Sequence, residues 1–267
     1  MNNYGNGYII LYLGSMFSSK TSALYEELIK HYYGGHKSLI IKKKNDNRYS
    51  NNGVIFTHDK KYISDNKIKK INDITVYKIQ NNIDVYSFEC NYLYEANEKI
   101  KNFDVILIDE IQFFEDAYIY CDKWANDKKI VICSGLNSTF KRSSFDTISK
   151  LIPRVECIIN RHSVCRETGN TASFSERLNE NNEEISIGGS ESYKPVDRIT
   201  YFNDLNKTKS AYQNYIFNEI IQLADLLKIN TKGLEEKIYK LIISNIKDNH
   251  FEGDYFEILK KLNKIKN

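Results

Sequence analysis

The sequence predicts an α/β fold in which a parallel sheet is flanked by helices, followed by a small irregular subdomain and a C-terminal helical extension. Three features of the chain predict this fold class. Continuous apolar runs of strand length recur in the first half, as expected for parallel strands that are buried on both faces. The first run passes through a glycine-started loop into a helical pattern, which is the order of a crossover unit. Near the C-terminus, apolar residues repeat at helix spacing.

The strands of the sheet are predicted at the apolar runs. The runs expected to form one parallel sheet are residues 8–13, 38–41, 103–108 and 129–134. Less regular segments that would extend this sheet lie at 53–56, 74–79 and 83–88. Residues 1–160 are therefore expected to form one sheet domain. The loop after the first run, described below, indicates that this domain binds a nucleotide.

Helices are predicted between these strands. Leu24 and Leu28 fall on one helical face, and a glycine pair ends that helix before the next strand. Further helices are expected at 90–101 and at 116–127. The second of these would place Trp124, together with a neighbouring cysteine, against the sheet.

Beyond residue 160 the sequence becomes polar and rich in turn residues. This stretch, with a short strand near 199–202, predicts a small irregular subdomain over residues 161–204. In the last segment, 205–267, the apolar residues at helix spacing are Tyr212, Ile216, Ile220, Leu223 and Leu227, then Leu234, Ile238, Leu241 or Ile242 and Ile246, and finally Phe256, Leu259 and Leu262. We interpret this extension as helices packed on the chain's own body or on another subunit, with a docking surface for a different protein as the alternative.

The composition argues against several classes of protein. With 267 residues, 41% of them hydrophobic, the chain can bury a substantial core. No apolar run approaches the length of a membrane span and the first residues lack a signal-peptide pattern, so a cytoplasmic protein is expected. The net charge of +3, from 38 basic and 35 acidic residues, does not indicate a nucleic-acid surface. Five scattered cysteines do not indicate a disulfide framework.

The loop after the first run, GSMFSSKT at residues 14–21, has the pattern of a phosphate-binding loop. In such a loop, backbone N–H groups face a nucleotide triphosphate, a lysine neutralises the outer phosphates and a hydroxyl holds Mg²⁺. Lys20 and Thr21 occupy those two positions, so ATP and Mg²⁺ are the expected cofactors. The motif has glycine before the lysine, whereas this chain has Ser19. If Ser19 is left-handed, the strain is about 1 to 2 kcal/mol, and weaker ATP binding is expected.

A pair of carboxylates follows the predicted strand at 103–108. Asp109 and Glu110 lie at its C-terminal end, which is the edge where open α/β sheets bind ligands. Beside a phosphate-binding loop, an aspartate in this place completes the Mg²⁺ shell, and a second carboxylate can accept a proton from an attacking hydroxyl. The alternative interpretation is that both residues merely end a strand.

Several further motifs follow one another in the order and spacing of one enzyme family. They are GSMFSSKT at 14–21, DNRY at 46–49, THD at 57–59, IDEIQFF at 108–114, GLNSTFKRSSF at 135–145, SERL at 175–178 and IGGSESY at 187–193. Together they resemble the P-loop thymidine kinases, whose members carry a zinc ribbon, and the resemblance covers about residues 8–202. A serial match is more specific than any single motif.

The resemblance implies that the chain transfers the γ-phosphate of ATP to the 5′-hydroxyl of thymidine. It implies that Glu110 is the catalytic base, and that Thr21 and Asp109 hold Mg²⁺. The residues that would bind the triphosphate are Gly14, Ser15, Met16, Phe17, Ser18, Ser19, Lys20 and Thr21, with Asp46, Asn47, Arg48, Asp109 and Gln112 nearby. Because phosphoryl transfer passes through a loose transition state, these groups mainly position and neutralise charge.

For the nucleoside, the resemblance implies an apolar pocket and a backbone segment that reads the pyrimidine edge. The pocket residues would be Met16, Phe113, Leu136, Phe140 and Phe145, and Ser175 is a further substrate residue. The backbone segment would be Glu184, Ile185, Ser186, Ile187 and Gly188, which would lie over the base together with Tyr193. Taken singly, each of these aromatic residues would be interpreted as part of the core. Thymidine is then the expected small-molecule partner, and a homo-oligomer is expected because relatives commonly form dimers or tetramers.

The zinc site of the family is degenerate in this sequence. Where the family has two CxxC pairs, this chain has Cys165 with Thr168 and Asp197 with Thr200. One cysteine of four cannot build a tetrahedral zinc site, and His162 is a weak substitute. The sequence therefore predicts no structural zinc.

These observations leave three hypotheses for the function. The first is an active thymidine kinase. The second is a catalytically impaired, kinase-like protein that acts in nucleotide binding or protein interaction, which Ser19, the lost zinc ligands and the helical extension would suit. The third is an ATPase. ATP affinity separates the first hypothesis from the second, and nucleoside-dependent use of ATP separates it from the third.

Overall fold

A computed structural model describes residues 7–44, 66–79, 83–178, 192–207, 209–247 and 250–264 of the chain. The chain divides into two units after Asp197. The first unit contains the large sheet, and the second is mostly helical. The predicted limits of three domains, 1–160, 161–204 and 205–267, stay a prediction.

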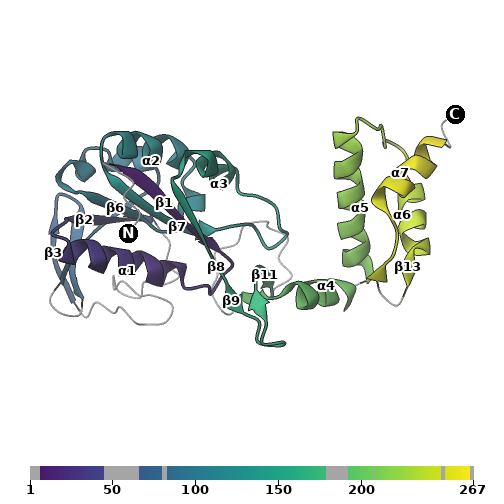
Figure 1. Ribbon diagram of the computed structural model, residues 1–267, viewed down its shortest axis with the longest axis horizontal. Helices are drawn as coiled ribbons and strands as arrows, with labels where there is room; N and C mark the ends of the chain where they lie inside the picture. The colour runs from purple at the N-terminus through teal and green to yellow at the C-terminus, as the bar shows by residue number, and fades with distance from the viewer. Residues whose placement is uncertain are drawn as a thin grey trace. The chain divides into compact units, whose positions relative to one another are not determined.

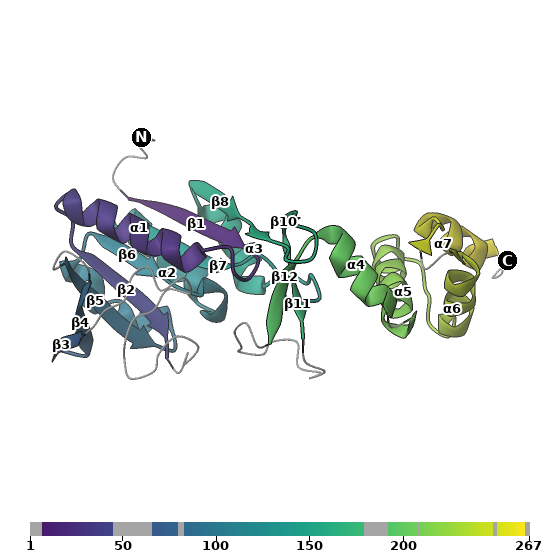
Figure 2. The same ribbon diagram turned by 90° about the horizontal axis from the view of Figure 1, so that it is seen from below.

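Within the described residues of the first unit, eight strands form one sheet in the order β3-β4-β5-β2-β6-β7-β1-β8. Figure 1 and Figure 2 show this sheet from two sides. The strands from β5 to β8 in this order run parallel, and β3 and β4 are antiparallel at one edge. Their bounds are β1 Tyr8–Gly14, β2 Ser38–Lys43, β3 Asn66–Ile71, β4 Ile74–Ile79, β5 Ile83–Cys90, β6 Val105–Ile108, β7 Ile130–Leu136 and β8 Cys157–Arg161. The parallel sheet predicted from the apolar runs is confirmed. The predicted strand at 53–56 lies outside the described residues.

Helices cover both faces of this sheet (Figure 1). Helix α1 Lys20–Tyr33 packs on one face, and α2 Ala117–Asn126 and α3 Asp146–Leu151 pack on the other. Alternate residues of β1 divide between the two cores: Ile10 packs with α1, whereas Ile9 packs with α2 and α3. Successive side chains of a strand point to opposite faces. Both faces are apolar here, which is why the strands appear in the sequence as continuous apolar runs.

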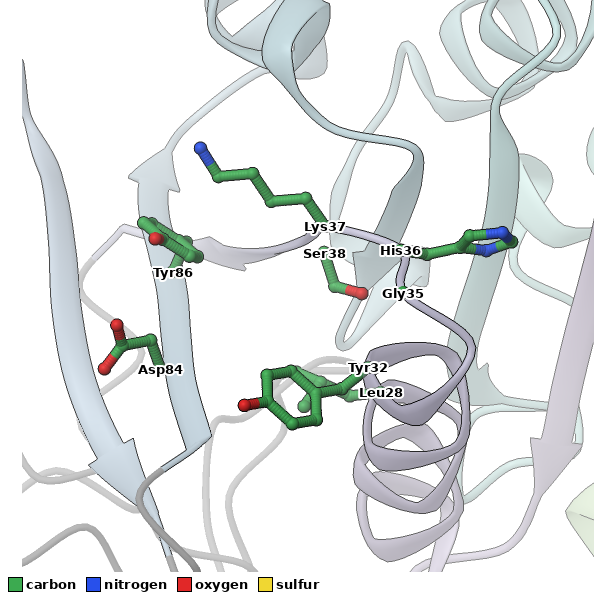
Figure 3. A pocket seen from close by; sticks show the side chains of 8 residues that line it. All are labelled: Leu28, Tyr32, Gly35, His36, Lys37, Ser38, Asp84 and Tyr86. Carbon is green, nitrogen blue, oxygen red and sulfur yellow. The ribbon is translucent and has the colours of Figure 1, made fainter.

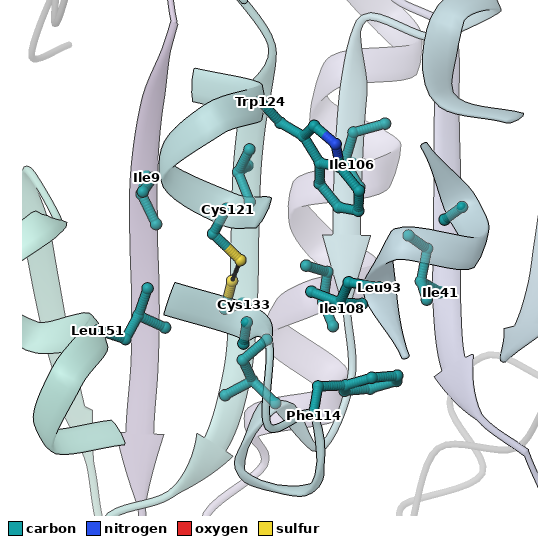
Figure 4. Packing of buried hydrophobic residues seen from close by; sticks show 14 of the residues in the cluster. Ile9, Ile41, Leu93, Ile106, Ile108, Phe114, Cys121, Trp124, Cys133 and Leu151 are labelled. Carbon is teal, nitrogen blue, oxygen red and sulfur yellow. Dashed lines mark hydrogen bonds between the residues drawn. The ribbon is translucent and has the colours of Figure 1, made fainter. Parts of the chain in front are cut away.

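The core beneath α2 contains the side chains that the sequence placed there (Figure 4). Trp124 is fully buried, and its indole Nε1 donates a hydrogen bond to Asn97 Oδ1 at 3.2 Å. The thiols of Cys121 and Cys133 face each other with 3.9 Å between their sulfur atoms. Burial raises the pKa of Cys121, and all five cysteines of the chain are free thiols.

The helix predicted at 90–101 is wrong, because two short 3₁₀ helices, η3 Leu93–Ala96 and η4 Lys99–Asn102, occupy that segment. Backbone N–H groups at the start of this segment donate hydrogen bonds to side-chain carboxylates. Glu95 accepts hydrogen bonds from the two N–H groups just before η3, and Asp116 accepts from the first two within it. Local caps of this kind compete with a regular helix.

Two small antiparallel strand pairs follow β8 in the first unit. One joins β9 Ser163–Val164 to β10 Thr171–Ala172, and the other joins β11 Phe174–Arg177 to β12 Tyr193–Val196. Figure 2 shows them beyond the C-terminal edge of the large sheet, near the end of β8. They bring Ala172 and Ser175 close to the loop after β1, as the contacts described below establish.

The second unit has its own apolar core, whose buried residues come from the helices α5, α6 and α7. The elements are α4 Arg198–Lys207, α5 Lys209–Leu226, α6 Glu235–Ser244, β13 Ile246–Lys247, β14 His250–Phe251 and α7 Tyr255–Lys264. Side chains of α5, α6 and α7 that recur at helix spacing, such as Ile216, Ile238 and Leu259, are buried in this core. The helices predicted for the extension are confirmed.

The short strand predicted near 199–202 is wrong, because these residues lie in α4. Their β-branched and aromatic side chains suited a strand, but tertiary packing decides the conformation. The ring of Phe202 packs edge-on against Tyr215 of α5, with 5.5 Å between the ring centroids.

No helix among the described residues has the length and apolar character needed to cross a membrane.

Candidate active site

The glycine-started loop connects β1 to α1 at the C-terminal edge of the parallel strands. Gly14 is the last residue of β1 and pairs with Arg161 at the end of β8. A Cβ atom on Gly14 would lie 2.1 Å from the carbonyl oxygen of Arg161 and 2.6 Å from the hydroxyl of Ser18. Because backbone atoms fill this space, the loop can pass here only with glycine.

Ser19 has a left-handed conformation, with φ 55° and ψ 35°. It precedes the first residue of α1, and its carbonyl oxygen accepts a hydrogen bond from the N–H of Ala23, which opens the helix. Its side chain is exposed and makes no cap hydrogen bond to the helix. The strain considered from the sequence is therefore present, at about 1 to 2 kcal/mol, and the serine hydroxyl does not offset it by capping.

Lys20 is buried and lies inside the curve of the loop. Its Nζ donates to the carbonyl oxygen of Ser15 at 2.6 Å and lies 3.4 Å from the hydroxyl of Ser18. The Ser18 hydroxyl donates to the same Ser15 carbonyl at 2.8 Å. The lysine charge is thus held at the loop that the sequence predicted to bind phosphates.

Residues far along the chain fasten the loop from outside. The Ser15 hydroxyl donates to the carbonyl of Ala172 at 3.0 Å, and the N–H of Met16 donates to the hydroxyl of Ser175, also at 3.0 Å. Arg161 donates through Nε to the carbonyl of Ser18 at 3.2 Å. Sequence reasoning missed Arg161. The available signal was a charged residue at the end of an apolar run.

Asp109 follows β6 and lies beside the start of α1. The hydroxyl of Thr21 lies 3.3 Å and 3.4 Å from its two carboxylate oxygens. Its Oδ1 also accepts from the Ser134 hydroxyl at 2.6 Å and from the N–H of Glu110 at 3.1 Å. The structure thus brings together residues that are 88 positions apart. Sequence reasoning missed Ser134, although a hydroxyl in the otherwise apolar run of β7 was a usable signal.

The oxygen groups around Asp109 fit a magnesium ion. Among the described residues, Oδ2 of Asp109 is contacted only by the Thr21 hydroxyl, so this oxygen keeps capacity to accept a further partner. Mg²⁺ prefers oxygen ligands and is commonly held by one or two carboxylates together with substrate phosphates. Thr21 and Asp109 supply oxygen ligands of this type next to the loop.

Glu110 is half-buried and has a left-handed backbone, with φ 53°. The side-chain amide of Gln112 donates to Oε2 of Glu110, and the amide oxygen of Gln112 accepts from the N–H of Leu136 at 3.1 Å. A Cβ atom on Gly135 would lie 2.7 Å from that amide oxygen, so the glycine leaves room for Gln112. The Glu110 carboxylate is therefore oriented from the end of β7.

The residues predicted to contact a nucleoside lie in three places. Phe140 and Tyr193 both contact Arg177, whose guanidinium carbon lies 5.2 Å and 5.9 Å from their ring centroids. Met16 is buried in the loop, and Phe113 and Leu136 are half-buried after β6 and at the end of β7. Phe145 lies in the buried core beneath α2 and α3, with 8% of its surface exposed.

Comparison with known proteins gives an independent result. The family model described as thymidine kinase matches residues 7–95 and 76–201 of the chain. The chain belongs to the thymidine kinase family. Thymidine kinases of Sheeppox virus, Amsacta moorei entomopoxvirus and vaccinia virus are 36%, 37% and 36% identical to it over 196, 202 and 197 residues. These alignments cover 73–74% of this chain and 97–98% of each relative.

The match to the thymidine kinase family ends at residue 201, so most of the second unit lies beyond it. Among solved structures, the ATPase DotB of Legionella pneumophila aligns with 91% of the chain and 62% of its own, at a TM-score of 0.37 and 13% identity. A likeness this distant adds nothing to the family assignment.

The positions that the resemblance predicts as degenerate zinc positions include members of a hydrogen-bonded cluster in this chain. The carboxylate of Asp197, which is 5% exposed, accepts from the hydroxyl of Thr168 at 2.6 Å and from the amide of Asn170 at 3.1 Å. The N–H of Cys165 donates to the carbonyl of Asn170 at 2.8 Å. Nowhere in the described part of the chain do three His, Cys, Asp or Glu side chains gather so that they could hold a metal ion.

Several predicted site residues lie outside the described residues. These are Asp46, Asn47 and Arg48 near the triphosphate, and Glu184, Ile185, Ser186, Ile187 and Gly188 over the base. Their roles stay predictions of the family resemblance.

A pocket of about 290 Å³ lies away from this site (Figure 3). It is formed where α1 ends and β2 begins, and its lining residues are Leu28, Tyr32, Gly35, His36, Lys37, Ser38, Asp84 and Tyr86. Since β1 and β2 point the same way, the start of β2 lies at the opposite edge of the sheet from the loop after β1. None of the predicted site residues lines this pocket.

Proposed function

We propose that the chain is a thymidine kinase that transfers the γ-phosphate of ATP to the 5′-hydroxyl of thymidine. The observation that carries this proposal is the contact of Thr21 with Asp109, which joins the phosphate-binding loop to the strand end that bears Glu110. A phosphate-binding group, an oxygen ligand set for a metal and a candidate base therefore share one edge of the sheet. The family assignment supports thymidine as the acceptor.

The loop supplies charge and backbone N–H groups for the triphosphate. Lys20 would leave its bond to the Ser15 carbonyl to meet the outer phosphates, and the N-terminus of α1 would face them. Thr21 and Asp109 would hold Mg²⁺ there, and when bound the ion would neutralise charge on the phosphate oxygens. Most of the rate enhancement in phosphoryl transfer comes from such positioning and charge stabilisation.

Glu110 would orient the 5′-hydroxyl and take its proton. In this step the bond between phosphorus and the ADP oxygen breaks, the bond to the 5′ oxygen forms, and the proton passes to the carboxylate. Gln112 does not accept this proton. Its amide donates a hydrogen bond to Oε2 of Glu110, and this bond fixes the orientation of the whole carboxylate.

The nucleoside would lie between the end of β7 and the β11–β12 pair. Met16, Phe113, Leu136 and Phe140 supply apolar or aromatic surface, and Tyr193 comes from β12. Phe145, which lies in the core cluster beneath α2 and α3, would complete this surface. Ser175 belongs to the proposed site because its hydroxyl accepts a hydrogen bond from the N–H of Met16. The proposal also includes a homo-oligomeric state and a cytoplasmic location.

The experiment that tests the proposal is an assay of thymidine monophosphate formed from Mg-ATP and thymidine. We expect product from the native chain and a loss of at least about a thousandfold in kcat for Glu110→Gln, since the variant keeps the shape but loses the base. Lys123→Met, a change on the exposed surface of α2, is the matched control and keeps full activity. ATP consumption without thymidine monophosphate, or no turnover by the native chain, would refute the proposal.

A further inference from the structure

Arg161 lies beside the phosphate-binding loop although it is not part of the loop motif. It is the last residue of β8 and pairs with Gly14, the last residue of β1. Since the two strands are parallel, they end at the same edge of the sheet. Arg161 therefore lies next to the first residue of the phosphate-binding loop. Its Nε donates to the carbonyl oxygen of Ser18 at 3.2 Å.

This hydrogen bond holds the peptide group directly before the strained residue. The Ser18 carbonyl belongs to the peptide between Ser18 and Ser19, and Ser19 has φ 55°. The chain after Ser19 is fixed, because the Ser19 carbonyl accepts the first helical hydrogen bond of α1 from Ala23. Relaxing Ser19 to an ordinary negative φ must therefore rotate the peptide before it, which would break the bond to Arg161.

The side chain of Arg161 is half-buried at the loop. On the face of the sheet that carries α1, the hydroxyl of Tyr12 donates to Glu27 at 3.0 Å. Burial and then Glu27 raise the pKa of Tyr12, and the positive charge of Arg161 opposes that rise.

We propose that Arg161 is a positioning residue for ATP binding, which holds the Ser18 carbonyl, keeps Ser19 left-handed and thereby sets Lys20 and the start of α1 for the phosphates. The proposal rests on the proposed role of the loop as the ATP site. Glycine adopts positive φ about as readily as negative φ. The brace is therefore needed because this chain has serine at position 19, and a glycine there would make it largely dispensable.

The test is a double-mutant cycle on the full chain with the variants Arg161→Met, Ser19→Gly and the double variant. Methionine keeps the apolar stem that packs at the end of β8 and removes the guanidinium. The dissociation constant of Mg-ATP is measured by calorimetry without thymidine, so that the result does not depend on phosphoryl transfer. Arg161→Lys is included as the conservative variant, because it keeps a donor and a charge.

We expect Arg161→Met to weaken Mg-ATP binding about tenfold when residue 19 is serine and less than about threefold when it is glycine, the loss of one hydrogen bond from a charged group. The lysine variant should stay within about threefold of the native chain. Thymidine binding should not change in any variant. An unchanged dissociation constant in Arg161→Met, or an equal loss in both backgrounds, would overturn the proposal.

A second measurement on the same variants, their stability without nucleotide, tests the proposal if a variant folds poorly or if the native chain binds no ATP. Unfolding without nucleotide is followed by the fluorescence of Trp124, the single tryptophan of the chain. Arg161→Met should lower the midpoint more beside Ser19 than beside glycine, and Arg161→Leu, whose side chain has no donor for the Ser18 carbonyl, should behave alike. Equal shifts in both backgrounds would refute the brace. Absence of ATP binding by a folded native chain would instead refute the role proposed for the loop.

Discussion

Replacing Ser19 by glycine removes the strain of the left-handed turn and should stabilise the fold. Ser19 has φ 55° and ψ 35°, its side chain is exposed, and it makes no cap hydrogen bond that the change would lose. The relieved strain is about 1 to 2 kcal/mol. Glycine costs about 0.5 to 1 kcal/mol through the greater freedom of the unfolded chain. The net gain in the free energy of unfolding therefore lies in a range of about 0 to 1.5 kcal/mol, with a central value of about 0.75 kcal/mol.

This gain should appear in stability rather than in ATP affinity. The turn is held by the protein's own groups, Arg161 on one side and the first hydrogen bond of α1 on the other. The strain is then borne by the folded chain with or without nucleotide, and it largely cancels from the binding equilibrium. The weaker ATP binding expected from the sequence would follow only if the nucleotide itself had to impose the turn.

The assay is thermal or urea unfolding of the first unit, reported by Trp124, together with calorimetry of Mg-ATP binding. A gain of this size raises the midpoint by about 1 to 4 °C. Lys128→Gly is the matched control, because Lys128 is exposed, has φ 66° and lies after α2, so it should give a similar gain without affecting the loop. Tenfold tighter ATP binding in Ser19→Gly with no gain in stability would refute this reasoning.

Three further outcomes follow from the structure. Gln112→Leu should lower kcat about tenfold or more with little change in the KM for ATP, because the Glu110 carboxylate loses its oriented donor; an unchanged kcat in the phosphate-transfer assay would contradict this. Treatment with a zinc chelator should leave the unfolding midpoint unchanged, whereas Asp197→Ala should lower the free energy of unfolding by about 1 to 3 kcal/mol, since Thr168 and Asn170 share that buried acceptor; a midpoint that falls on chelation alone would show that a metal is needed. Burial lowers the pKa of His31 below its usual 6.5, so the unfolded chain binds the proton more readily and stability should fall as the pH drops below about 6.5; urea unfolding between about pH 7 and pH 5 should show a shallower loss for His31→Gln, and identical slopes would argue against His31 as the source.

The parts of the fold that could be predicted from the sequence are those specified by local pattern. The order of strand, loop and helix around residues 14–21 is encoded in consecutive residues, and so is the pair Asp109 and Glu110 at the end of a run. The parallel sheet follows because strands buried on both faces must be apolar throughout. The contact of Thr21 with Asp109 then follows from the topology, since both lie at the same edge.

The parts that sequence reasoning missed depend on contacts between distant residues. Arg161 and Ser134 join the site through Ser18 and Asp109, which follow the ends of other strands, and no spacing in the sequence indicates those pairs. The segment at 90–101 contains helix-forming residues, but the capping carboxylate of Asp116 comes from a later turn. The α4 residues suited a strand until their packing against α5 was known. In each case tertiary contacts overrode the local preference.

The two glycine positions of the loop motif differ in how freely evolution can change them. At position 14 an added methyl group would lie 2.1 Å from the carbonyl oxygen of Arg161, in the strand β8 that pairs directly with β1. At position 19 the side chain points to solvent, and the penalty is a torsional strain of limited size that one nearby arginine can help the chain to tolerate. The glycine before the lysine can therefore be replaced while the loop keeps its conformation, whereas the first glycine of the motif cannot be replaced in this way.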